Sequence, residues 1–233
     1  MACIDEVKLF FAIDNRDLDL VEDLLKKWQL LTPDLYFEYP LLFTAVAKNN
    51  LEMVKLLYTH CFQYCSQYQM REAGPYSWDC LHFALEMHPS DFILAGSIEE
   101  ELFTNSLIIQ ELLQKNWDVT LKNSDGDSAL HLAIKACKFD AVFSIINIMI
   151  EQGLALNVVN SHGQSPLHLV VLQNTLNLDI AKLLAENMSS DDFKIADLEG
   201  KKIYHCLSEN ENISDEDKEA FVAFVENCFG EDK

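Results

Sequence analysis

Apolar residues recur at helical spacing in successive pairs of runs along the chain. In the pair at 42–46 and 51–57, Leu51, Val54 and Leu57 fall on one face of a helix. Comparable pairs occur at 9–13 with 18–25, at 81–85 with 102–113, and at 129–134 with 142–150. The pattern predicts consecutive pairs of helices that each bury one apolar face, with no extensive β-sheet.

The second half of the chain repeats itself at a fixed step of 37 residues. The step separates the members of two sets: Gly126, Gly163 and Gly200, and His131, His168 and His205. Each glycine closes a short polar segment that is typical of a tight turn, where Gly supplies a positive φ. Self-similarity at such a period indicates a stacked-repeat protein, in which each repeat packs only on its neighbours.

The residue pattern of the repeats resembles that of the ankyrin family. The segment 165–169, Ser-Pro-Leu-His-Leu, is similar to the Thr-Pro-Leu-His-x-Ala core of the ankyrin repeat. Phe10 precedes Phe43 by 33 residues, which is the standard ankyrin step. The resemblance implies an all-α ankyrin-repeat solenoid of about six helix-turn-helix repeats with short β-hairpin turns. We expect one domain over 1–233, with repeats near 4–34, 35–73, 74–122, 123–159, 160–196 and 197–230.

Four positions depart from the family's pattern. Cys80 and Ala129 stand where the family has Pro, whereas Arg16 and Cys137 stand where it has Gly. These departures leave the expected fold unchanged, but they make the edges of the repeats approximate.

Repeat three carries an insertion. His82 precedes His131 by 49 residues, about a dozen more than the step elsewhere, and we place the extra residues at 88–105. Ser97 and Glu100 look like a capping box, which predicts that the second helix of this repeat opens there. An insertion in a solenoid maps to one face and can belong to the binding surface.

Charge and hydropathy limit the partners of the chain. Its 233 residues carry a formal net charge of −21, from 38 acidic and 17 basic residues. Such a field repels a phosphate backbone and attracts a basic protein surface, so we expect a protein partner and no nucleic acid. The longest apolar run, at 142–150, is too short to cross a membrane, and residues 1–6 hold no secretory signal. We therefore expect a cytoplasmic, monomeric protein without a membrane partner.

The cysteines indicate a reducing compartment. They are seven in number and scattered at unrelated spacings, and several are expected on buried helix faces as small apolar residues. Cys61 and Cys65 beside His60 would suggest a metal, but a second ligand pair at a suitable spacing is missing. We expect no metal and no cofactor.

Histidine recurs at one repeat position, which favours a structural role. The residues are His82, His131, His168 and His205. In the family this histidine bonds within and between the hairpin turns, so the resemblance implies scaffolding. No pattern of nucleophile with base and no phosphate loop is present, and we expect no enzymatic activity. The competing hypothesis is an enzyme whose site is not visible in sequence, using the region of His60.

Aromatic residues gather at positions expected in the hairpin fingers of repeats two and three. In ankyrin-like repeats the fingers and the ends of the first helices form the concave binding surface, and aromatics are enriched at binding hot spots. We expect a partner protein on the finger side, at Tyr36, Phe37, Tyr39, Tyr76, Trp78, Asp125, His162 and Glu199. Two alternatives remain: the aromatics cover an edge of the core, or with acids such as Glu38 and Asp79 they read a methylated lysine or basic tail.

Acidic residues crowd the last 25 positions, and Phe229 lies near the end. This resembles the acidic C-terminal translocation signals of type IV secretion effectors of intracellular bacteria, among which ankyrin repeats are frequent. Two arginines against fifteen lysines suit an AT-rich bacterial genome. The resemblance implies an effector in the host cell cytoplasm. The alternative is a capping helix that begins after Ser214, with Phe221, Phe224, Val225 and Cys228 on one face.

Overall fold

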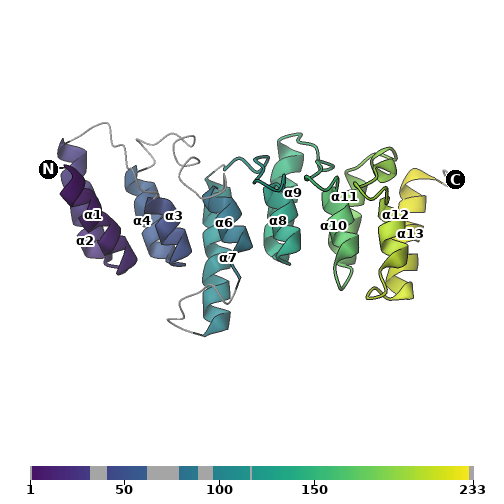
Figure 1. The fold of residues 1–233 in the computed structure, drawn as a ribbon, viewed down its shortest axis with the longest axis horizontal. Helices are drawn as coiled ribbons and strands as arrows, with labels where there is room; N and C mark the ends of the chain where they lie inside the picture. Colours follow the sequence, from purple (N-terminus) through teal and green to yellow (C-terminus); the bar gives the residue numbers. More distant parts are fainter. Residues whose placement is uncertain (1, 32–40, 62–78, 89–96, 116, 231–233) are drawn as a thin grey trace. The chain divides into compact units, whose positions relative to one another are not determined.

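A computed structural model describes residues 2–31, 41–61, 79–88, 97–115 and 117–230 of the protein (Figure 1). These residues form twelve α-helices and no extended strand. Two isolated antiparallel bridges close hairpin turns, Lys122 with Ser128 and Ala196 with Lys202. The prediction of a solenoid of helix-turn-helix repeats with short hairpin turns is confirmed. The chain divides into two compact units, Met1–Asp118 and Val119–Lys233, and each is described by itself.

The described residues of the first unit form three helix pairs. They are α1 (Ala2–Asp14) with α2 (Leu18–Leu31), α3 (Leu41–Ala47) with α4 (Leu51–Cys61), and α6 (Cys80–Glu86) with α7 (Ile98–Gln114). The first helices pack on one another, α1 on α3 and α3 on α6, and the second helices do the same. The unit therefore has two layers of helices.

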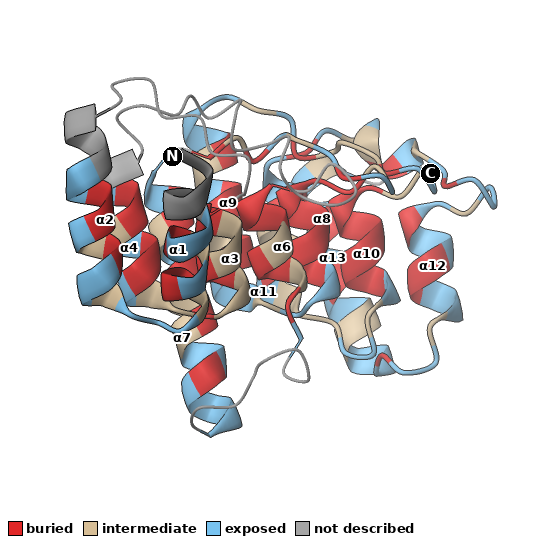
Figure 2. Cartoon of the chain, turned by 60° about the vertical axis from the view of Figure 1, so that its left-hand side comes forward, coloured by how far each residue is buried: buried red, intermediate tan, exposed pale blue. Residues whose placement is uncertain are grey.

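The second unit repeats this arrangement. Its pairs are α8 (Ala129–Lys135) with α9 (Phe139–Glu151), α10 (Pro166–Leu172) with α11 (Leu178–Glu186), and α12 (Ile203–Glu209) with α13 (Asp215–Phe229). A 3-10 turn, η3 (Asp192–Lys194), precedes the last turn and packs on α12. Buried residues lie on the packed sides of the helices, shown in red in Figure 2. Among the described residues no helix has the length and apolarity that a membrane crossing requires.

Polar side chains fix the starts of several helices. The Asp79 carboxylate accepts the main-chain N–H of His82 at 2.8 Å, and the Ser165 hydroxyl caps α10, which has Pro166 at its first position. Such caps satisfy amide groups that have no partner within the helix. Ser214 caps α13 as predicted, since its hydroxyl accepts the N–H of Asp217 at 3.1 Å.

The turn between the two helices of a repeat needs a residue in the left-handed backbone conformation. Arg16, Asn49 and Cys137 occupy it with φ of 59°, 50° and 54°. Side chains rarely adopt this conformation without strain, which explains why the ankyrin pattern has Gly at the places of Arg16 and Cys137. The backbone is therefore left-handed at these two places although neither residue is Gly.

The insertion of repeat three lengthens a helix. The Ser97–Glu100 capping box is present, with the Ser97 hydroxyl accepting the Glu100 N–H at 3.2 Å and the Glu100 carboxylate accepting the Ser97 N–H at 3.0 Å. The later part of the expected insertion therefore belongs to α7, whose 17 residues make it the longest described helix. Figure 1 shows that α7 extends beyond α6.

The cysteines differ in burial. Cys80 and Cys206 are buried, whereas Cys137 and Cys228 are exposed. Of the apolar face expected on α13, Phe221 and Val225 are buried, but Cys228 is not. The expectation that Cys228 belongs to a buried apolar face was wrong, because the cover over the face of Phe221 and Val225 does not reach Cys228 near the end of α13.

Candidate partner-binding surface

Three hairpin turns of the second unit share one conformation. In the first, Asn123 Oδ1 accepts the N–H groups of Asp125 at 3.0 Å and Asp127 at 2.9 Å. Asn160 and Asp197 do the same for the residues two and four positions later. A side-chain oxygen that bonds its own backbone two residues on is a typical way to stabilise a turn. Asn and Asp at this repeat position therefore set the shape of each turn.

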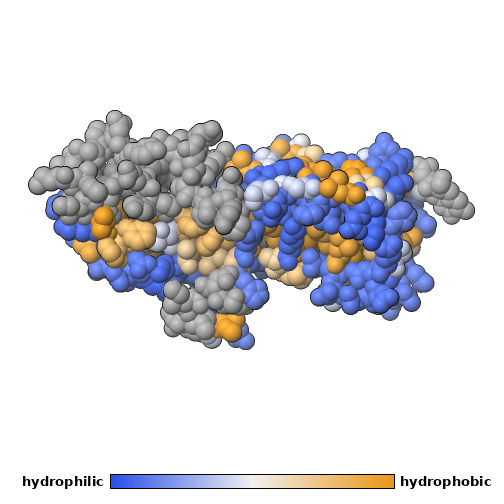
Figure 3. Space-filling view, viewed as in Figure 1, coloured by the Kyte–Doolittle hydropathy of each residue, from blue (hydrophilic) through white to orange (hydrophobic). Residues whose placement is uncertain are grey.

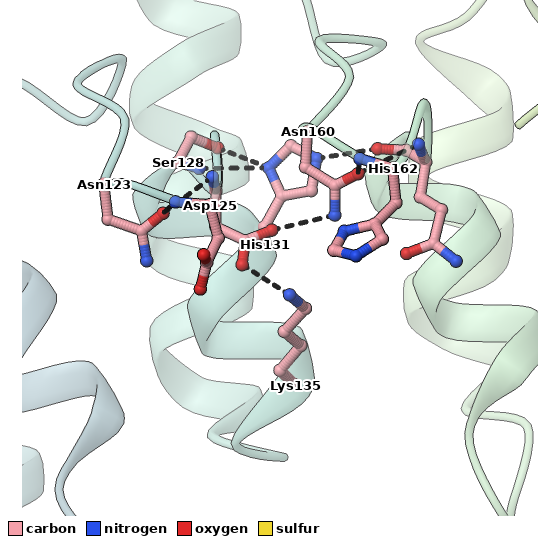
Figure 4. Close-up of polar contacts among 9 residues, drawn as sticks. Asn123, Asp125, Ser128, His131, Lys135, Asn160 and His162 are labelled. Carbon is pink, nitrogen blue, oxygen red and sulfur yellow. Dashed lines mark hydrogen bonds and ion pairs between the residues drawn. The ribbon is translucent and has the colours of Figure 1, made fainter. Parts of the chain in front are cut away.

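The turns are also bonded to one another. The N–H of Ser161 donates to the Asp125 carbonyl at 2.9 Å, and the N–H of Leu198 donates to the His162 carbonyl at 2.9 Å. The Asn160 amide donates to the Asp127 carboxylate at 2.9 Å (Figure 4). Because the first two bonds use only main-chain atoms, the side chains of Asp125 and His162 are not needed to hold the stack.

Glycine allows the turns to approach each other. Gly126 and Gly163 have φ of 73° and 74°, and a Cβ atom on Gly126 would lie 2.7 Å from the Ser161 nitrogen. A Cβ on Gly163 would lie 3.0 Å from the Leu198 nitrogen. The repeated Gly therefore serves both the turn conformation and the close contact with the following turn.

Of the repeat-position histidines, His131 connects two turns as the resemblance implied, whereas His205 is exposed and contacts only its own turn. His131 Nδ1 lies 2.8 Å from the Ser128 hydroxyl, and its Nε2 lies 3.1 Å from the Gln164 carbonyl of the next turn. His168 Nδ1 makes the same contact with Ser165 at 2.8 Å. Its Nε2 is buried and has no hydrogen-bond partner among the described residues.

Burial lowers the pKa of both His131 and His168, because the imidazolium form would lose its hydration. Nearby carbonyls, that of Gln164 for His131 and that of Lys201 for His168, oppose this shift in part. Neutral, buried and hydrogen-bonded rings of this kind act as structural elements of the stack.

The structure brings three predicted site residues into one row. Asp125, His162 and Glu199 are separated by the 37-residue step, occupy the same place in successive turns, and are all exposed. We call them the turn-tip row. The other five, Tyr36, Phe37, Tyr39, Tyr76 and Trp78, lie outside the described residues. Whether a partner contacts any of the eight stays a prediction.

Ion pairs beside the turn-tip row were not foreseen from the sequence. The Lys135 ammonium, at the end of α8, contacts the Asp127 carboxylate at the base of the first turn, as Figure 4 shows. The Lys201 ammonium, in the third turn, lies 2.8 Å from Glu209 and 3.5 Å from Glu199. Asp127 with Lys135 and Lys201 with Glu209 are opposite charges eight residues apart at one repeat register, but this spacing alone does not show that the side chains meet.

An open groove lies beside the third turn, between α10 and α12. Its volume is about 360 Å³. We call it the α10–α12 groove; its walls include Gln164, Leu172, Glu199, Lys201, Glu209 and Asn210. The Asn210 amide donates to the carbonyls of Val171 at 3.0 Å and Gln173 at 2.8 Å, which holds the ends of α10 and α12 together. The groove reaches from Glu199 of the turn-tip row to Leu172 and Glu209 at the ends of α10 and α12.

A second candidate surface lies on the projecting part of α7. Ile98, Leu102 and Phe103 expose 51%, 38% and 66% of their area. Figure 3 shows a small area of apolar surface, in orange, on this projecting part. The neighbouring Glu101 is buried, and its carboxylate accepts the Asn49 amide at 2.7 Å. This bond anchors the helix on the α3–α4 turn, so the apolar side chains extend from a fixed support.

One buried group has the composition of a catalytic site but the geometry of a cap. His82 Nδ1 lies 2.7 Å from Asp79 Oδ1, and Cys80 stands between them in sequence. The side chains of Asp79 and His82 are 1% exposed, and burial raises the pKa of the Cys80 thiol, which favours its unreactive protonated form. The side chains of His60, Cys61 and Cys65 lie outside the described part of the chain. Within that part, no group of three or more His, Cys, Asp or Glu is arranged to hold a metal ion.

Comparisons with known proteins agree with this geometry. Residues 101–213 match the family model described as ankyrin repeats in three copies. The ankyrin repeat domain of Bcl-3, a member of the IkappaB protein family, matches 93% of this chain and 85% of its own at 21% identity, with a TM-score of 0.64. An ankyrin repeat domain from Acinetobacter baumannii AYE matches 94% of this chain and 98% of its own at 17% identity, with a TM-score of 0.67. No curated protein matches by sequence.

These matches show that residues 101–213 resemble ankyrin repeats and that the fold is that of an ankyrin repeat domain. At such identities the two solved structures establish the fold alone. An ankyrin-repeat domain is in general a protein-interaction module and typically has no catalytic site.

Proposed function

We propose that the chain is a non-catalytic module that binds a partner protein with a basic surface through its turn side in repeats two to five. The observation that carries this proposal is the turn-tip row. Asp125, His162 and Glu199 present three exposed side chains on turns whose backbones are bonded to one another. A rigid, exposed row loses little conformational freedom on binding, which favours affinity.

The negative charge of the chain supports a partner with a basic surface. Two of the three turn tips are acidic, and the chain carries a net charge of −21. A field of this sign accelerates encounter with a basic protein and slows encounter with an acidic one. The partner surface should therefore be rich in lysine and arginine.

Affinity capture tests the proposal. The intact chain is used to capture proteins from a cell lysate, alongside a tip variant with Asp125→Ala, His162→Ala and Glu199→Ala. The matched control carries Glu151→Ala and Glu186→Ala, which remove the same two acidic charges from exposed ends of α9 and α11. A basic protein captured by the control and lost by the tip variant supports the proposal. Equal capture by both variants contradicts it. Binding to a panel of peptides with methylated and unmethylated basic tails distinguishes ordinary protein docking from recognition of methylated lysine.

We also propose that the protein acts as a bacterial effector in the host cell cytoplasm. Support comes from the acidic end of the chain, where Glu211, Glu216, Glu219 and Glu226 are exposed on or beside α13. These side chains are available to a secretion receptor without unfolding the helix. Replacing the four by Gln in a reporter fusion should abolish translocation by a type IV-competent strain while leaving helix content unchanged. Translocation at the original level would contradict the effector role of these acids.

A further inference from the structure

The walls of the α10–α12 groove follow the repeat register. One position contributes Gln164 and Lys201, and another, eight residues later in each repeat, contributes Leu172 and Glu209. Repeat four has Asp127 and Lys135 at the same two positions, outside the groove. Both sets advance by 37 residues, so corresponding members occupy equivalent places on successive first helices and turns. The surface can therefore be read as two rows that run side by side.

The two rows have opposite polarity at their ends. In repeat four the acid is on the turn and the lysine on the helix, as Asp127 with Lys135. In repeat six the lysine is on the turn and the acid on the helix, as Lys201 with Glu209 at 2.8 Å. The middle repeat has no charge at either place and exposes 43% of Leu172.

Lys201 differs from Lys135 in the number of its acidic neighbours. Its ammonium lies within 4 Å of two carboxylates, those of Glu209 and Glu199, and Glu199 is itself in the turn-tip row. Hydrogen bonding to Glu209 raises the pKa of Lys201, and Glu199 adds to this shift. The two acids thus form a site for a cation, and the chain's own lysine occupies it.

This arrangement selects the chemistry of an incoming segment. The apolar Leu172 forms one wall, and about 360 Å³ of open groove accommodates side chains beside it. Arginine has a planar fork of donors that pairs with carboxylates in two parallel bonds, which a lysine cannot match. An arginine next to an aliphatic residue therefore fits both features.

We propose that the α10–α12 groove binds a partner segment in which an arginine adjoins an aliphatic side chain, and that Lys201 is a built-in competitor for this arginine. The aliphatic group packs on Leu172, and the guanidinium takes the place of the Lys201 ammonium between Glu199 and Glu209. The inference rests on the proposed function, because it identifies what the turn side recognises at repeats five and six.

A peptide titration tests this directly. The probe is the blocked synthetic peptide Gly-Ser-Leu-Arg-Leu-Ser-Gly, compared with peptides that have Glu or Gln in place of Arg. The full chain is labelled with nitrogen-15 and followed by amide NMR shifts. The arginine peptide should shift the amides of residues 172, 199–201 and 209, and it should bind several-fold more tightly than the other two.

Two variants isolate the role of Lys201. Lys201→Met should raise the affinity for the arginine peptide several-fold, because the acid pair loses its internal cation, and Glu209→Gln should lower it by a similar factor. Lys194→Met is the matched control, since it removes a lysine that pairs with Asp191 at 2.8 Å elsewhere in the same unit. Circular dichroism confirms that each variant keeps its helix content.

Several outcomes would overturn the inference. They are an equal gain of affinity for Lys201→Met and Lys194→Met, equal binding of the glutamate peptide, and shifts confined to residues outside the groove. The proposed function is tested separately with the captured partner. If the tip variant loses that partner while Leu172→Ser with Glu209→Gln retains it, the groove inference is wrong and the proposed function stands. If the tip variant also retains the partner, the proposed function itself is wrong.

Discussion

His131 Nε2 lies 3.1 Å from the carbonyl oxygen of Gln164, which is 33 residues later in the chain. The ring thereby bonds its own turn through Nδ1 and the next turn through Nε2. Two hairpins that contain no extended strand are held together by this side chain, by the bond from the Asn160 amide to the Asp127 carboxylate and by main-chain bonds. The stability of the second unit therefore depends on the protonation state of the ring.

Stability should fall as the pH drops below the ordinary histidine value. Burial lowers the pKa of His131 and His168 below 6.5 in the folded chain, so the unfolded chain binds more protons in this range. The contribution is fully present above about pH 6.5 and is lost as the pH falls toward the folded pKa. Urea unfolding at about pH 7.5 and about pH 5.5 should give a lower midpoint at the acidic value.

A control identifies the source of this pH dependence. His162 is exposed at a turn tip, so His162→Gln should leave the difference between the two midpoints unchanged. A midpoint that rises on acidification, or a difference that disappears in His162→Gln, would show that the buried rings do not control stability in this range.

Substitution of Gly126 and of Gly200 by Ala should differ in cost, because only Gly126 lies against a following turn. Gly126→Ala and Gly200→Ala both place a side chain at positive φ, at a cost of about 1 kcal/mol. At Gly126 the new Cβ would also meet the Ser161 nitrogen at 2.7 Å, whereas at Gly200 nothing lies within 4 Å. Overpacking should add roughly 1 to 3 kcal/mol at Gly126 alone. Equal losses in chemical denaturation would mean that the turns are not in close contact.

Cys137→Gly should stabilise the protein. Cys137 has a φ of 54°, and its exposed thiol donates a weak hydrogen bond to the Gln173 side chain at 3.5 Å. Relief of the left-handed strain should raise the free energy of unfolding by about 1 kcal/mol. Cys137→Ala keeps the strain and serves as the comparison, with stability close to that of the unmodified chain. If both variants gain equally, the backbone at this position is not strained.

The aromatic positions predicted in the fingers of repeats two and three lead to a separate binding test. Tyr76→Ala with Trp78→Ala should keep the helix content measured by circular dichroism and lose the captured partner, because truncating one such anchor typically costs about 2 kcal/mol or more. Lys55→Ala, on the exposed side of α4, is the control. Retained binding, or loss of the fold, would make these aromatics ordinary packing residues.

The 37-residue step allowed the sequence to predict the turns, the helix pairs and the structural histidines. It did so because each repeat folds by local rules: an Asn or Asp that shapes the turn, a Gly at positive φ, and a capped apolar helix. The row of Asp125, His162 and Glu199 follows from the same register. The repeat register alone therefore places those three positions on exposed turn tips.

The charged surroundings of the row could not be predicted in the same way. The pairing of Lys201 with Glu199 and Glu209 depends on how a turn folds back over its own first helix, which periodicity does not specify. The exposure of Cys228 was missed for a related reason. An apolar spacing shows which residues share a face of α13, but not how far along the helix that face is covered.

The most direct test of the central claim is the rate at which the captured partner associates with the chain as salt is raised. Stopped-flow measurements from about 50 mM to about 300 mM salt would compare the unmodified chain, Asp125→Ala with Glu199→Ala, and the charge-matched control Glu151→Ala with Glu186→Ala. We predict a rate that falls steeply with salt for the unmodified chain and the control, and a slower, flatter dependence for the tip pair. The same salt dependence in both double variants would contradict a basic partner that docks on the turn-tip row.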